Sequence, residues 1–200
     1  MPKDWTGNSQ AVYSTLAASN HSQSDRENHD YYATPPNVVE ELLSREQFSK
    51  YIWECASGGG HIAEVLKQKG YDVKCSDIID RGYEDTEIAD FLTTERNVND
   101  TARDIITNPP YKLSVEFVNH ALEISDNGTK VAMFLKIQFL ETKKRYELFK
   151  KYPPKKIYVF VNRVNCGKNG VFGKESSAVC YCWFVWEKGY KGNPTVDWIT

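Results

Sequence analysis

Tyr51-Ile-Trp-Glu-Cys-Ala-Ser-Gly-Gly-Gly60 is the stretch that decides the fold, because a short apolar run ends in three consecutive glycines. The run predicts a strand at residues 51–55, and a helix follows at 61–70, closed by a glycine at its C-terminal end. Residues 71–77 predict the next strand. A strand, a helix and a strand in this order form a βαβ unit with two parallel strands and a right-handed crossover.

Strand and helix patterns alternate along the rest of the chain. A helix is predicted before this unit, at 37–44, and a weakly marked third strand segment ends at 87–92. The remaining predicted strands are 104–107, 130–135, 155–162 and 178–186, and the remaining predicted helices are 113–124 and 141–151. The last two strands have no helix between them, which predicts a closing antiparallel hairpin. We therefore expect one α/β domain over residues 29–200, with a mostly parallel seven-stranded sheet, helices on both faces and a flexible arm at 1–28.

The composition narrows the class of protein. Hydrophobic residues make up 40% of the chain, as in ordinary globular enzymes, and no apolar run is long enough to span a membrane. The amino terminus lacks the apolar core of a signal peptide, so we expect a cytoplasmic protein. The five cysteines show no Cys-x-x-Cys spacing, so we expect reduced thiols and no metal site.

Charge is distributed unevenly, although the net charge is only −2. Residues 1–128 contain 11 Lys and Arg against 22 Asp and Glu, a net of −11, whereas residues 129–175 contain 12 against 3, a net of +9. The basic segment suggests an anionic partner, although exposed helices and loops also commonly carry lysine.

Asn108-Pro-Pro-Tyr111 directly follows the strand predicted at 104–107. It is a stiff corner, because proline has a fixed φ and no N–H and pushes the residue before it to an extended backbone. The Asn108 amide oxygen and the Pro109 carbonyl can converge on one NH2 group, while Tyr111 can stack on a flat base. The corner therefore suits a planar substrate with an exocyclic amine, at the end of a strand where α/β sheets bind ligands. The alternative is a proline turn that only ends a strand.

A nucleotide-binding pattern precedes this corner. Gly58-x-Gly60-x-x-Ala63 fits the glycine fingerprint, and Asp77 follows Gly58 by 19 residues, close to the spacing of an acid that binds a ribose hydroxyl. The pattern does not name the cofactor, because adenosine dinucleotides and adenosylmethionine use the same geometry. A tight strand-to-helix turn without a ligand is the alternative.

Together these motifs resemble the adenosylmethionine-dependent amino-methyltransferases, most closely the small phage-type DNA adenine methyltransferases, from about residue 5 to residue 188. The resemblance implies a Rossmann-like methyltransferase fold, with S-adenosylmethionine bound by a loop over its methionine end (Tyr32, Thr34, Pro35), a glycine loop (Glu54, Ala56, Gly58, Gly60), a ribose-binding acid and its neighbour (Asp77, Ile78) and an adenine-binding pair (Asp90, Phe91). It implies that Asn108, Pro109, Pro110 and Tyr111 form the catalytic motif. Larger family members have an added target-recognition domain, and none is expected here.

The substrate implied by the resemblance is the N6 amine of adenine in DNA, in a bacterial or phage-infected cell. The target base leaves the duplex to reach Asn108. Phe172 is a candidate second aromatic wall for that base, although it can equally fold onto the core. Arg163 and Lys168 are candidate phosphate contacts, and we expect little sequence preference.

Other readings remain open. The same corner can act on adenine in RNA or on a protein glutamine amide, because related methyltransferases with this motif use those substrates. A nicotinamide oxidoreductase is a weaker alternative, because nothing in the sequence offers a hydride partner. The chain can also be an inactive methyltransferase fold that binds nucleic acid or protein.

Overall fold

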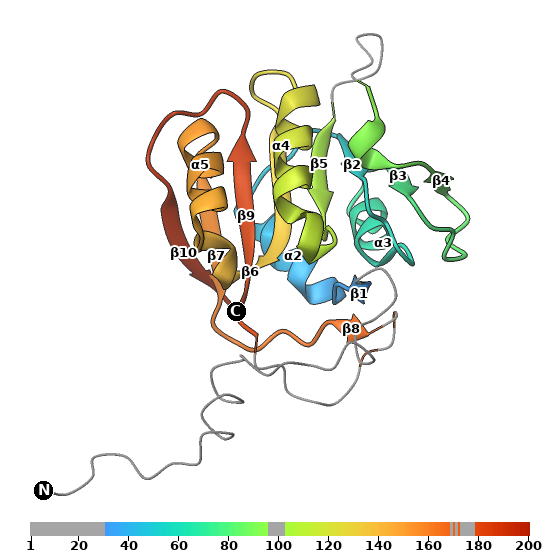
Figure 1. Cartoon of the computed structure of the whole chain (residues 1–200). Coiled ribbons are helices and arrows are strands. Elements are labelled where there is room, and N and C mark those ends of the chain that lie inside the picture. Colours follow the sequence, from blue (N-terminus) through green and yellow to red (C-terminus); the bar gives the residue numbers. More distant parts are fainter. Residues whose placement is uncertain (1–30, 96–102, 169, 171, 173–178) are drawn as a thin grey trace, which may run out of the picture.

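An eight-stranded sheet forms the centre of the computed structural model, which describes residues 31–95, 103–168, 170, 172 and 179–200 (Figure 1). The strand order is β10-β7-β9-β6-β5-β2-β3-β4. The pairs β6–β9 and β7–β9 are antiparallel and all other pairs in this sheet are parallel. The strands are β2 (Tyr51–Glu54), β3 (Asp72–Asp77), β4 (Thr86–Ile88), β5 (Asp104–Thr107), β6 (Lys130–Lys136), β7 (Lys156–Phe160), β9 (Tyr181–Glu187) and β10 (Thr195–Ile199).

The predicted α/β class, the mostly parallel sheet and the closing hairpin β7–β9 are confirmed. The prediction of seven strands was wrong by one, because β10 continues the sheet parallel to β7. The apolar side chains of β10 are largely exposed, since Val196 is 49% exposed and Trp198 is 61% exposed. The strand is held by backbone hydrogen bonds to β7, and such bonds leave no apolar pattern in the sequence from which the strand could be predicted.

A separate two-stranded sheet joins the start of the described chain to the loop after β7 (Figure 1). Its strands are β1 (Tyr32–Ala33) and β8 (Gly167–Lys168), which pair antiparallel with Ala33 opposite Gly167. Neither strand was predicted, since two residues are too few to show periodicity. The pairing places this loop beside the segment that precedes the first long helix.

Helices cover both faces of the sheet, as predicted (Figure 1). They are α2 (Pro36–Arg45), α3 (His61–Gln68), α4 (Ser114–Ile124) and α5 (Lys143–Lys151), with short 3-10 helices η3 (Phe91–Thr93), η4 (Tyr111–Leu113) and η5 (Ile137–Leu140). Successive side chains of a strand point to opposite faces. In β9, therefore, Phe184 packs in the core with α4 and α5, and Trp183 packs in the core with α2 and α3.

The flexible arm expected at 1–28 lies outside the described residues. No helix in the described ranges is long and apolar enough to cross a membrane.

Candidate active site

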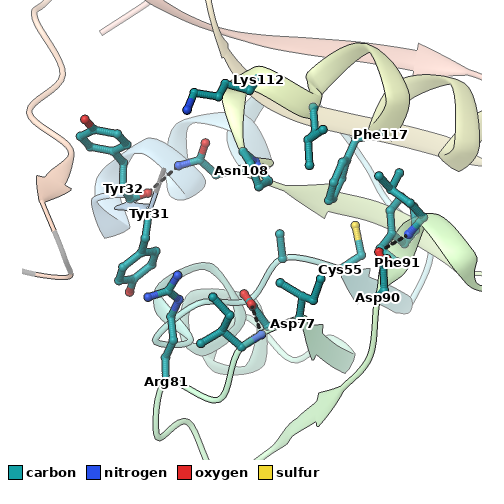
Figure 2. Close-up of a pocket in the computed structure, with 16 residues that line it drawn as sticks. Tyr31, Tyr32, Cys55, Asp77, Arg81, Asp90, Phe91, Asn108, Lys112 and Phe117 are labelled. Carbon is teal, nitrogen blue, oxygen red and sulfur yellow. Dashed lines mark hydrogen bonds between the residues drawn. The ribbon is translucent and has the colours of Figure 1, made fainter. Parts of the chain in front are cut away.

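A cavity of about 400 Å³ lies where β2, β3 and β5 end and the following loops begin (Figure 2). This is the carboxyl edge of the parallel strands, where α/β sheets bind ligands. The volume is in the range of small-molecule sites. The cavity is lined by Tyr31, Tyr32, Cys55, Ala56, Asp77, Ile78, Ile79, Arg81, Asp90, Phe91, Leu92, Asn108, Pro110, Lys112, Leu113 and Phe117.

Asn108 is held in one orientation by the segment that contains β1. Its Nδ2 donates to the Tyr32 carbonyl at 2.7 Å and to the Thr34 hydroxyl at 3.1 Å (Figure 2). Because a backbone carbonyl can only accept, these contacts also fix which end of the amide is nitrogen. No described residue donates a hydrogen bond to Oδ1, so the amide oxygen keeps its lone pairs for a ligand.

The two prolines after Asn108 differ in what their carbonyls do. The Pro110 carbonyl accepts from Leu113 N at 2.9 Å, whereas no donor to the Pro109 carbonyl is found among the described residues. Pro109 is buried, and Pro110 contributes to the cavity wall. The corner therefore has a second carbonyl without an internal partner, beside the Asn108 oxygen.

Tyr111 does not line the cavity, although it was predicted to stack on the target base. Its ring stacks on Tyr32 with centroids 5.9 Å apart, and Lys136 Nζ lies 4.5 Å from the ring centroid. Tyr32 does line the cavity. In this structure the Tyr32 ring therefore occupies the stacking position beside Tyr111 where the target base was expected.

The glycine turn has the backbone that the fingerprint requires. Gly58 and Gly60 have φ of +56° and +80°, which L side chains rarely adopt. The loop faces Tyr31, whose ring would lie 2.4 Å from a Cβ added at Gly58 and whose hydroxyl accepts from Gly59 N at 2.9 Å. Gly58 and Gly60 are thus covered by Tyr31 and Tyr83 and do not line the cavity.

Asp77 lies at the end of β3 as predicted, and its carboxylate is already used by the chain. Oδ2 accepts from Gly58 N at 2.8 Å and Oδ1 accepts from Ile79 N at 2.9 Å. A carboxylate has about four lone-pair sites, so acceptor capacity remains for a hydroxyl in the cavity. Asp77 therefore supports the glycine loop as well as lining the cavity.

Glu54 was predicted to bind the cofactor but lies completely buried behind the cavity wall. Its Oε1 accepts from Ala56 N at 3.2 Å, and Oε2 makes no hydrogen bond of normal geometry. Burial raises the pKa of Glu54 to about 8, although the Thr107 hydroxyl and the Ala56 N–H both lower it. At pH 7 the side chain is therefore mostly protonated. Ala56, its neighbour in the loop, does line the cavity.

Asp90 and Phe91 form one end of the cavity (Figure 2). Asp90 Oδ1 accepts from Leu92 N at 3.0 Å and caps η3, which leaves Oδ2 without a donor among the described residues. Phe91 is wedged edge-to-face against Trp53, with ring centroids 5.1 Å apart. Ile78 lines the same cavity and is 60% exposed, so a flat apolar ligand would cover it.

Eight lining residues were not predicted as site residues, and three of these carry a hydroxyl or a positive charge: Tyr31, Arg81 and Lys112. The Arg81 guanidinium lies 4.2 Å from the Tyr31 ring centroid, at the end of the cavity opposite Phe91 (Figure 2). Arg81 Nε is buried without a hydrogen-bond partner. Arg81 follows Asp77 by only four residues, which is the one signal that could have indicated it.

Two of the three predicted substrate contacts, Phe172 and Arg163, do not line the cavity that contains Asn108. The Phe172 ring packs edge-to-face on His61, with centroids 5.6 Å apart, and borders a second cavity together with Arg163. The third, Lys168, is in β8, opposite Tyr32.

Much of the basic segment is paired with carboxylates, which the sequence could not show. These pairs are Lys144–Glu116, Lys150–Glu147, Lys151–Glu123 and Lys155–Glu187, with N–O distances of 2.6–3.0 Å. Internal partners therefore account for much of the local excess of lysine, and the charge count alone does not require an anionic partner. No group of three or more metal-ligating side chains occurs in the described ranges.

Comparison with known proteins gives the fold a context. No protein-family model matches the chain, and no curated protein matches it. A Pyrococcus horikoshii protein proposed to be an RNA methyltransferase superposes with a TM-score of 0.60 at 15% identity, over 90% of this chain and 99% of that one. The chain has a Rossmann-like methyltransferase fold.

Other solved structures share this fold. A Listeria monocytogenes protein, proposed to be a class I S-adenosylmethionine-dependent methyltransferase, gives a TM-score of 0.56 at 13% identity, over 94% of this chain and 71% of that one. A Vibrio vulnificus protein, proposed to be the modification subunit of a type I restriction enzyme, gives 0.53 at 15% identity, over 96% of this chain and 51% of that one. At these identities the likeness concerns the fold, so activity is argued from the site.

Proposed function

We propose that this chain is an S-adenosylmethionine-dependent methyltransferase acting on the exocyclic N6 amine of adenine in DNA. The observation that carries the proposal is the fixed Asn108 amide, whose nitrogen donates to Tyr32 and Thr34 while its oxygen has no donor among the described residues. An amide oriented in this way can accept a hydrogen bond from a ligand N–H group.

The chemistry of an aromatic amine explains why two acceptors are needed. The lone pair of adenine N6 is delocalised into the ring, which makes the nitrogen a poor nucleophile. Acceptors placed against its two N–H groups favour the pyramidal form, in which the lone pair is available. The Asn108 oxygen and the Pro109 carbonyl are two acceptors at this corner to which no residue of the described ranges donates. They would also fix the amine in line with the methyl group.

The cavity residues fit adenosylmethionine, which when bound supplies an activated methyl group on a sulfonium. Ile78, Leu92 and Phe117 give an apolar wall for a purine. Asp90 Oδ2 and the remaining lone pairs of Asp77 can accept from amine and hydroxyl donors. Arg81 lies at the opposite end and can pair with a carboxylate. The cavity thus has an apolar end for the purine, then acids for the ribose hydroxyls, then a cation for the methionine carboxylate, which is the order of these groups in adenosylmethionine.

A nucleic acid is the substrate class that the surroundings favour over a protein amide. Lys112 is an exposed cation in the cavity wall. Lys136 lies over the ring of Tyr111, which is next to Lys112 in the chain but does not line the cavity. A cation in the cavity wall attracts a phosphate backbone, whereas a glutamine side chain would gain nothing from it. Adenine in DNA and adenine in RNA present the same amine, so the test measures both.

The test is a nucleoside analysis of cells that express the protein. DNA and RNA are digested separately and their nucleosides are measured by mass spectrometry, with Asn108→Ala as the matched variant. We expect N6-methyladenine to increase in DNA with the wild-type chain only. An increase confined to RNA would move the assignment to RNA adenine. Adenosylmethionine binding without any methylated nucleoside would favour a binding module.

A further inference from the structure

A second cavity, of about 370 Å³, is lined in part by Pro35 and Pro36, which directly follow the segment that holds Asn108. Its polar and aromatic lining comes from three places in the sequence: the start of α2, the loop after β7 and the loop after β8. The residues that matter are Asn37, Asn162, Arg163, Asn165 and Phe172. The site proposed above uses none of them.

The lining has the side chains that bind a nucleotide. Phe172 is 44% exposed and can offer a ring face for stacking, which is the sequence-tolerant part of single-strand recognition. Asparagine amides carry a donor and an acceptor side by side and can bind a base edge with two hydrogen bonds. Arg163 is an exposed guanidinium that can pair with phosphate or with the edge of guanine.

The two cavities are linked by a very short piece of chain. Tyr32 lines the first cavity and Pro35 lines the second, and Thr34 between them accepts from Asn108. Three residues span at most about 10 Å, which is the rise of about three stacked nucleotides in one strand. The backbone pairing of Ala33 with Gly167 ties the loop after β7 to this same piece of chain. A strand with its target adenine at Asn108 therefore brings a neighbouring nucleotide to the second cavity.

We infer that the second cavity binds a nucleotide flanking the target adenine and gives the enzyme a sequence preference at that position. Phe172 stacks on the flanking base, the asparagines bind its edge and Arg163 contacts its phosphate or, for guanine, its edge. The inference rests on the proposed function, because it needs a nucleic-acid substrate. It replaces the sequence-based expectation of little sequence preference.

The test uses the purified full chain, adenosylmethionine and short oligonucleotides that contain one adenine. Each flanking position, up to three on either side, carries each of the four bases in turn, and kcat/KM is measured for every oligonucleotide. We expect a spread of roughly tenfold among the four bases at one flanking position, as a single bidentate base contact provides. Phe172→Ala with Arg163→Ala should reduce that spread to about twofold.

Tyr146→Ala is the matched control, because Tyr146 is a 61% exposed aromatic on α5 outside both cavities. This variant should keep the wild-type spread, even if its rates fall uniformly. Ratios among oligonucleotides are insensitive to partial unfolding of a variant. Methylation with no flanking preference, or with a preference that survives the double substitution, would overturn the second site and leave the proposed function standing. Absence of methylation on every oligonucleotide would overturn both.

Discussion

Glu46 and Glu54 lie on opposite sides of β2 in the chain and have opposite surroundings, because Glu46 caps the carboxyl end of α2 before the strand and Glu54 is the last residue of the strand. Glu46, at the amino edge, accepts from Lys130 Nζ at 2.6 Å and from the Tyr158 hydroxyl at 2.7 Å. Burial would raise its pKa, but these two partners hold the pKa below the ordinary value. Glu54, at the carboxyl edge, has no cation beside it, and burial raises its pKa to about 8. One glutamate is an ion held in a network, and the other is a neutral group.

The same contrast appears at the two ends of β5. Asp104 begins the strand, and its two oxygens accept from Ser49 N at 2.6 Å and Lys130 N at 2.8 Å. Asn108 follows the strand, and its oxygen has no donor among the described residues. Polar groups at the amino edge are thus satisfied within the chain, whereas the carboxyl edge keeps acceptors for a ligand. Asp77 does both, because its carboxylate accepts hydrogen bonds from two backbone N–H groups and also lines the cavity.

Asn108→Ala should have the largest effect, confined to activity. Removing the oriented acceptor should lower methyl transfer by about 10³-fold or more, as loss of a preorganised polar group does. Adenosylmethionine affinity should change little, and unfolding free energy should fall by about 1 kcal/mol through the two lost hydrogen bonds. Single-turnover kinetics and denaturant unfolding measure the two quantities. A loss of stability that matched the loss of activity would make Asn108 a structural residue.

Asp104→Ala should show the reverse pattern. Two partly buried N–H groups lose a charged acceptor, which should destabilise the fold by about 1.5–3 kcal/mol. Methyl transfer per folded molecule should remain near the wild-type rate. Asp197→Ala is the control, because the Asp197 side chain is 52% exposed and its substitution should change stability by less than about 1 kcal/mol. Equal effects of the two substitutions in denaturant unfolding would contradict the account of the amino edge.

Arg81→Ala should weaken cofactor binding selectively. Loss of a charge-assisted contact to the carboxylate should lower the affinity for adenosylmethionine by about tenfold. The affinity for 5′-methylthioadenosine, which lacks the amino-acid part, should stay the same. Arg45→Ala, at the opposite edge of the sheet, should change neither affinity. Calorimetry with the two ligands decides the point, and an equal loss for both would place Arg81 at the adenosine instead.

Glu54→Gln should change the pH dependence of stability and little else. The folded-state pKa of Glu54 is raised from 4.5 to about 8, so the folded protein binds one more proton than the unfolded chain between these values. Its contribution to stability is complete below pH 4.5 and is lost as the pH rises to about 8, at up to about 1.4 kcal/mol per pH unit. Glutamine does not titrate, so the variant should lose this slope. An unchanged slope in unfolding measured from pH 5 to 8 would show that Glu54 is ionised.

The sequence predicted best what depends on local pattern. The four helices, the strands other than β1, β8 and β10, and the turn at Gly58 and Gly60 follow from apolar periodicity and from glycine spacing. Contacts between distant segments had no such signal. Tyr31 over the glycine loop, Phe172 against His61 and the pairs of α5 lysines with Glu116 and Glu123 depend on packing between segments far apart in sequence. The Asn108 corner was predicted as a motif, but its fixing by Tyr32 and Thr34 required the structure.

The central claim is that Asn108 presents its oxygen to the exocyclic amine of adenine. The most direct measurement is transfer of a labelled methyl group from adenosylmethionine to an oligonucleotide with one adenine, compared with the same oligonucleotide carrying unsubstituted purine in its place. The account predicts labelled N6-methyladenine from the first, no label in the second, and almost none in either with Asn108→Ala. Label incorporated equally into both oligonucleotides, or undiminished by Asn108→Ala, would contradict it.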